Sequence, residues 1–111
     1  MAAGDWKDMI YAIERGNLEG VRYHIEEGVD PNFQHAEYFG TALITSIEQN
    51  QMAIAEYLLT NGADPNLAAA FSSDTPLKVA RRLKNKAAVE LLKTNGAKEG
   101  WAERFRLDLW L

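Results

Sequence analysis

The sequence of 111 residues contains no cysteine, two histidines, three prolines and no long apolar run. Without cysteine it has neither disulfides nor thiolate metal sites nor thiol nucleophiles. No stretch approaches the roughly 18 apolar residues that a membrane-spanning helix needs, so no membrane contact is expected. The first residues lack the basic and apolar regions of a secretory signal. Together these absences favour a small cytoplasmic domain.

The charge is acidic overall and unevenly distributed. Twelve basic and sixteen acidic residues give a formal net charge of −4. Residues 1–74 hold three basic and twelve acidic residues (−9), whereas residues 75–111 hold nine basic and four acidic ones (+5). The acidic total argues against nucleic-acid binding. The asymmetry indicates a strong dipole that steers the approach of a partner.

Two motifs recur at the same interval along the chain. Gly28-Val29-Asp30-Pro31-Asn32 reappears as Gly62-Ala63-Asp64-Pro65-Asn66, and a weaker copy begins at Gly96, so both steps are 34 residues. Thr41-Ala42-Leu43 and Thr75-Pro76-Leu77 are separated by the same 34 residues. Two markers in register with one period indicate a repeat protein whose units must stack to bury their apolar faces.

Each unit shows the pattern of two short helices. Apolar spacing predicts helices over residues 6–15, 18–27, 41–49 and 52–61, and a third pair follows Thr75 and Asn85. Thr75 and Asn85 are suited to be N-caps, and Pro76 suits the first helical position. Gly16 and Asn50 fall at turns between helices, where a left-handed conformation is needed.

The motifs Asp74-Thr-Pro-Leu-Lys-Val-Ala80, Tyr57-Leu-Leu-Thr-Asn-Gly-Ala-Asp-Pro-Asn66 and Glu90-Leu-Leu-Lys-Thr-Asn-Gly-Ala97 resemble the ankyrin-repeat family. The resemblance implies an all-α solenoid of three helix-turn-helix repeats with short β-hairpin-like fingers and a C-terminal extension. The ankyrin-repeat domain would span residues 1–98, with repeats of about 5–40, 41–74 and 75–98, and the extension residues 99–111. The histidine that follows T-P-L in the family is replaced by Ile10, Ile44 and Lys78, which puts its hydrogen bonds between loops in question.

In the family that the chain resembles, the fingers and the first helix of each repeat line a concave protein-binding face. Here the fingers are residues 33–40 and 67–74. Tyr38, Phe39 and Phe71 are candidate aromatic anchors of this face, and we expect Tyr38 and Phe71 to be exposed. The alternative for Phe39, as for Phe33, is that it packs the finger against the helices. The remaining candidates that flank this groove are Glu14, Arg15, Glu37, Glu48, Gln49, Arg82 and Leu83.

No set of residues indicates catalysis, a metal or a cofactor. His24 takes the place of Leu58 and Leu92 in the later repeats and is interpreted as a core or end-face residue. His35 lies near Glu37, but no third ligand accompanies the pair. Asp30 and Asp64 resemble the aspartates that accept turn amides. We therefore expect a protein that is not an enzyme.

The basic run over residues 81–86 and the C-terminal tail each have two readings. The basic run complements a helix dipole, or alternatively binds an acidic partner. Trp101, Phe105 and Leu109 are spaced as one helical stripe that would cover Leu83, Val89 and Leu92. As alternatives, Leu107, Leu109 and Leu111 line a strand, or the tail is exposed and binds a partner or a second copy.

The sequence therefore predicts a non-catalytic protein–protein interaction module, an adaptor or inhibitor, that binds an unidentified protein partner. We expect a monomer, with dimerisation through the tail as the alternative. The competing functions are a self-assembling or structural unit that uses the tail and, less favoured, a toxin-neutralising immunity-type protein whose acidic face covers a basic enzyme site.

Overall fold

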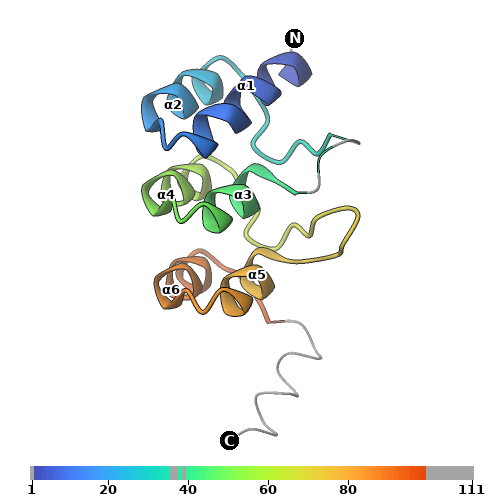
Figure 1. Ribbon diagram of the computed structural model, residues 1–111, viewed down its shortest axis with the longest axis vertical. Helices are drawn as coiled ribbons and strands as arrows, with labels where there is room; N and C mark the ends of the chain where they lie inside the picture. The colour runs from blue at the N-terminus through green and yellow to red at the C-terminus, as the bar shows by residue number, and fades with distance from the viewer. Residues whose placement is uncertain (1, 36–37, 39, 100–111) are drawn as a thin grey trace, which may run out of the picture.

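A computed structural model describes residues 2–35, 38 and 40–99, which contain six α-helices and no strand. The helices are α1 (Ala2–Glu14), α2 (Leu18–Glu26), α3 (Ala42–Glu48), α4 (Met52–Thr60), α5 (Pro76–Arg82) and α6 (Lys86–Thr94). Figure 1 shows α1, α3 and α5 in one row beside the long loops, and α2, α4 and α6 in a second row. The all-α repeat solenoid expected from the sequence is confirmed.

Capping side chains fix where most of the helices begin. The hydroxyl groups of Thr41 and Thr75 accept hydrogen bonds from the third residue beyond each, at 3.1 Å in both cases. Asn17 and Asn85 cap α2 and α6 in the same way, at 3.0 Å. A cap of this kind contributes about 1 kcal/mol, because it pairs an amide that the helix itself leaves without a partner. The predicted caps at Thr75 and Asn85 are confirmed, as is Pro76 in the first turn of α5.

The turn between the helices of each repeat contains one residue with a left-handed backbone. Gly16 has φ = 70° and Asn50 has φ = 55°, as their residue types predict. In the third repeat the same position is occupied by Lys84, with φ = 57°. A lysine side chain tolerates this conformation less well than glycine or asparagine does, so the third turn is locally strained.

The core runs continuously through the stack. Helix α3 contacts α1 on one side and α5 on the other, and α2 contacts α4. Because it is enclosed in this way, every residue from Ala42 to Ile47 is buried. The two buried hydroxyl side chains of α3 donate to the backbone, Thr45 to Thr41 O at 2.9 Å and Ser46 to Leu43 O at 2.6 Å. The largest fully buried side chains are those of Trp6, Met9, Ile13, Leu43, Ile44, Ile47, Ile54, Leu58, Leu77 and Leu92.

Side-chain amides, rather than the missing histidines, bridge the loops of neighbouring repeats. Asn32 donates to Gly62 O at 2.9 Å and accepts from the Asp64 amide at 2.8 Å. Thirty-four residues later Asn66 bridges the next pair of loops in the same way, to Gly96 O at 3.1 Å and from the Lys98 amide at 2.8 Å. Each amide therefore acts as donor and acceptor at once across one boundary between repeats.

The aspartates of the repeated motif organise the turns, as predicted. Asp30 accepts a hydrogen bond from the Asn32 amide at 2.8 Å, and Asp64 accepts one from the Asn66 amide at 2.8 Å. This local bond holds each bridging asparagine in place for its contact with the next loop.

The fingers are loops in the part of the chain that the structure describes, and the β-hairpin-like expectation for them is not confirmed. The second finger closes on itself through hydrogen bonds from Ala69 N to Asp74 O and from Ser73 N to Ala69 O, both 2.8 Å. A side-chain bridge also joins the two fingers, because Gln34 donates to Ala68 O at 3.1 Å and accepts from the Ala70 amide at 2.8 Å. Residue 36, Glu37 and Phe39 of the first finger lie outside the described residues.

The three apolar residues that the tail was expected to cover differ in their exposure to solvent. Leu92 is fully buried, Val89 is partly buried, and Leu83, which follows α5 as its C-cap, is 49% exposed. Leu83 therefore does not continue the inward stripe of α5. The tail residues Trp101, Phe105 and Leu109 lie outside the described residues, as do Leu107 and Leu111.

Candidate protein-binding face

Six predicted groove residues lie at equivalent positions of the three first helices. Glu14, Glu48 and Arg82 are the last residues of α1, α3 and α5, and Arg15, Gln49 and Leu83 immediately follow them. All six side chains are exposed. Because α1 contacts α3 and α3 contacts α5, the six form one continuous row. We call this row, together with the finger residues Tyr38 and Phe71, the inner face.

Phe71 matches its predicted role as an exposed aromatic residue. Its side chain is 60% exposed. The second finger, to which it belongs, is a loop on the side of the molecule where α1, α3 and α5 stack (Figure 1). Phe33 instead packs against the core, with its ring edge-on to Trp6 at 5.6 Å, as expected. An exposed ring of this size on a loop is the kind of side chain that anchors protein interfaces.

The prediction that Tyr38 is an exposed anchor is wrong, because this ring is partly buried. It packs edge-on against Trp6 with the ring centroids 5.3 Å apart. Its hydroxyl lies 3.0 Å from the Thr45 hydroxyl. Since Thr45 already donates its single hydroxyl proton to Thr41 O, Tyr38 is the donor of this bond. Burial raises the pKa of Tyr38 above its ordinary value, and the carboxylates of Glu14 and Glu48 add to this effect. The ring therefore fixes the first finger to α3.

Charged side chains meet where the second finger joins α5. Arg82 donates to the Asp74 carboxylate at 3.1 Å, and Lys78 lies 3.8 Å from the same carboxylate. Burial raises the pKa of Glu48, Arg82 opposes this shift, and Asp74 adds to it. Asp74 and Lys78 were not among the predicted site residues, although their spacing of four residues is typical of a helical ion pair.

A second feature that the sequence did not reveal is an aromatic pocket of about 250 Å³ beside α1. Trp6 forms its buried floor, and Tyr11, Glu14 and Tyr38 are among its other lining residues. His35 also lines it and stacks on Trp6 with the ring centroids 5.7 Å apart and an angle of 12° between the rings. His35 thus packs against the tryptophan.

The other histidine, His24, is partly buried on α2 beside Tyr23, which agrees with its interpretation as a core or end-face residue. Among the described residues, no group of three or more histidine or acidic side chains is arranged to hold a metal ion. No helix within that part of the chain has the length and apolar character to span a bilayer.

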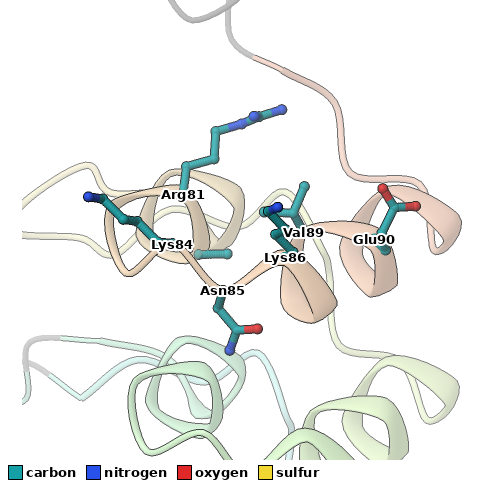
Figure 2. Close-up of a pocket in the computed structure, with 7 residues that line it drawn as sticks. Arg81, Lys84, Asn85, Lys86, Val89 and Glu90 are labelled. Atoms are coloured by element: carbon teal, nitrogen blue, oxygen red, sulfur yellow. The ribbon is translucent and has the colours of Figure 1, made fainter.

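The basic run surrounds a hollow of about 410 Å³ on the third repeat. Figure 2 shows Arg81 pointing away from the second repeat and Asn85 pointing toward it, where Asn85 donates to the side chain of Asn50 at 3.2 Å. Lys84 and Lys86 are exposed, whereas Arg81 forms an ion pair with Glu99. Arg81 and Arg82 occupy the last turn of α5, where cations complement the helix dipole as predicted.

Comparison with protein families gives one match over most of the chain. Residues 9–100 match the family model described as ankyrin repeats (3 copies). The chain is an ankyrin-repeat protein. A search of curated protein sequences found no match. Ankyrin repeats are in general protein–protein interaction modules and non-catalytic. In this ankyrin-repeat protein, the fingers and first helices that such modules use carry the inner face.

Proposed function

We propose that this ankyrin-repeat protein is a non-catalytic adaptor or inhibitor that binds a protein partner on its inner face. The observation that carries the proposal is the exposed Phe71 in the second finger, a loop that the Asp74–Arg82 ion pair joins to the row of Glu14, Glu48 and Arg82. An aromatic ring surrounded by polar and charged side chains is the arrangement found at the centre of many protein interfaces. The helices behind it are rigidly packed, so little ordering is needed on binding.

The acidic charge of the first two repeats supports a partner with a complementary basic surface. Residues 1–74 carry −9 in total, whereas the row on the inner face balances Glu14 and Glu48 against Arg15 and Arg82. A basic enzyme surface covered by an inhibitor of this kind, as in an immunity-type protein, is one such partner. We further propose that this activity is cytoplasmic and that the free protein is a monomer.

Site-specific photo-crosslinking tests the proposal and identifies the partner. A photoreactive phenylalanine is placed at Phe71 and, as a matched control, at Tyr23, which is 59% exposed on α2 in the other row of helices. The proposal predicts a discrete crosslinked species from position 71 and none from position 23. Crosslinking from position 23 alone would move the binding surface to the outer helices and refute the proposal.

Self-assembly through residues 99–111 is the competing function, and sedimentation separates the two. A mass that stays monomeric across concentrations agrees with a partner-binding module. A mass that rises with concentration and falls back when residues 100–111 are removed would support self-assembly instead.

A further inference from the structure

The aromatic pocket beside α1 has the size of a side-chain site. Its volume of about 250 Å³ is below the roughly 300–1,000 Å³ of typical small-molecule sites. It lies between the exposed surface of α1 and the first finger, next to the Glu14 end of the inner face. A partner that lies along the inner face would therefore pass over it and can insert one side chain.

The walls of the pocket are aromatic and held in place by packing. Trp6 is 2% exposed and contacts the rings of Phe33, His35 and Tyr38 at centroid distances of 5.6, 5.7 and 5.3 Å. Tyr11, at the mouth, is 48% exposed. The exposed ring of Tyr11 can offer its negative π-face to a cation, an attraction of about 0.5–1 kcal/mol at an exposed site.

The lining of the pocket contains one carboxylate that a cation can pair with. Glu14 lines the pocket and is exposed, Lys7 lines it as the opposing charge, and Asp8 is exposed six residues before Glu14 on α1. Burial raises the pKa of Tyr38, which lines the pocket, and the carboxylates of Glu14 and Glu48 add to this effect. The first 74 residues add a net −9. The acidic charge of these repeats favours a cationic ligand over an anionic one, although Lys7 in the lining opposes it.

We infer that this pocket receives a basic side chain, arginine or lysine, of the protein partner. The inference rests on the proposed function and names the chemistry that the first repeat recognises. The charged end of such a side chain would lie over the Tyr11 ring and pair with the Glu14 carboxylate, while its aliphatic stem would lie along the apolar lining of the pocket. Arginine is favoured over lysine, because its planar guanidinium stacks on rings and pairs with a carboxylate through two donors.

Lys7 provides an internal check on this inference. It is the one basic residue of the chain that lines the pocket among the described residues, and its long side chain is exposed. A bound cation and the Lys7 ammonium repel each other, so Lys7 weakens the binding of a partner's basic side chain. Removal of the Lys7 charge is therefore expected to strengthen binding of a cation and to leave binding of a neutral side chain unchanged.

Nuclear magnetic resonance titration with blocked amino acids tests the inference without the partner. The probes are N-acetyl-arginine amide, N-acetyl-lysine amide and the neutral N-acetyl-norleucine amide. We expect the two cationic probes to shift the amides of Tyr11 and Glu14 and the indole N–H of Trp6, with arginine the tighter. The indole nitrogen is buried without an acceptor among the described residues, so its resonance is a sensitive reporter of the pocket.

Two variants with matched controls decide the outcome. Tyr11→Leu and Glu14→Gln should each weaken binding of the arginine probe about two- to fivefold, the effect of 0.5–1 kcal/mol. The controls Tyr23→Leu and Glu26→Gln make the same changes at exposed positions of α2 and should have no effect. Lys7→Gln should tighten binding of the arginine probe.

Two results would overturn the inference. In the first, the neutral norleucine probe shifts the same resonances to the same extent as the arginine probe, which would mean that the pocket binds apolar side chains without regard to charge. The other is a Glu14→Gln variant that binds arginine as tightly as the wild type. Neither result touches the proposed function, because crosslinking from Phe71 reports on partner binding separately. Conversely, a partner found on α2 would refute the inner face even if the probes bind.

Discussion

Replacement of Asn32 by alanine tests whether side-chain amides hold the repeats together in this chain. Asn32 joins the loops of the first and second repeats through two hydrogen bonds, to Gly62 O and from the Asp64 amide. Each such bond contributes a net 0.5–1.5 kcal/mol, so the pair contributes about 1–3 kcal/mol. Because the bonds are exposed to water, we expect a loss toward the lower end, about 1–2 kcal/mol, in the free energy of unfolding.

Urea denaturation followed by circular dichroism measures this loss directly. The melting temperature of Asn32→Ala should be several degrees below that of the wild type. Asn66→Ala removes the equivalent pair of bonds between the second and third repeats and should cost a similar amount. The matched control is Asn61→Ala, since the Asn61 amide donates only within its own segment, to Tyr57 O. It should cost less than either bridging variant.

The aspartate variant shows which half of the bridge matters. Asn32→Asp keeps the acceptor for the Asp64 amide but replaces the donor to Gly62 O with a carboxylate oxygen, which a carbonyl repels. The loss at neutral pH should therefore persist, and it should shrink in acid as the new carboxyl is protonated and can donate. Unchanged stability of both Asn32→Ala and Asn66→Ala would refute the view that these amides replace the missing histidines.

Three further predictions follow from the structure. Glu48→Gln should stabilise the fold at neutral pH, because the raised pKa of Glu48 means that its charged form costs stability in the folded state. Thermal melting at several pH values should show this gain disappear in acid, where the wild-type carboxyl is protonated as well. Lys84→Asn should raise the free energy of unfolding by up to about 1 kcal/mol in urea, because asparagine accepts the left-handed backbone better. Deletion of residues 100–111 should lower the melting temperature by several degrees if the tail covers Val89 and Leu83, whereas unchanged melting would leave the tail as a binding element.

The repeat pattern was sufficient to predict the helices, because it is set by local chemistry. Gly28, Gly62 and Gly96 all have φ near 100°, which few other residues adopt, so they mark where each repeat leaves its second helix. The capping residues are likewise local signals, since a cap depends on a side chain and an amide three residues away. The 34-residue period then places Glu14, Glu48 and Arg82 in one row without further information.

The features that were missed depend on contacts between segments distant in the sequence. Tyr38 looked like an exposed finger residue, but α1 brings Trp6 against its ring and α3 offers it the Thr45 hydroxyl. The aromatic pocket arises from the same meeting of α1 with the first finger. Asn32 carried no sign of its partner Gly62, 30 residues away, because a bridge between loops forms only after the repeats have stacked.

The most direct test of the inner face is the affinity of the crosslinked partner for two variants, measured by isothermal titration calorimetry. Phe71→Ala removes a ring that is 60% exposed on the inner face, and Tyr23→Ala removes one that is 59% exposed on α2. The account predicts that Phe71→Ala weakens binding at least about fivefold, the loss of 1 kcal/mol or more that anchor residues show, while Tyr23→Ala binds as the wild type does. Wild-type affinity of Phe71→Ala together with weakened binding of Tyr23→Ala would contradict it.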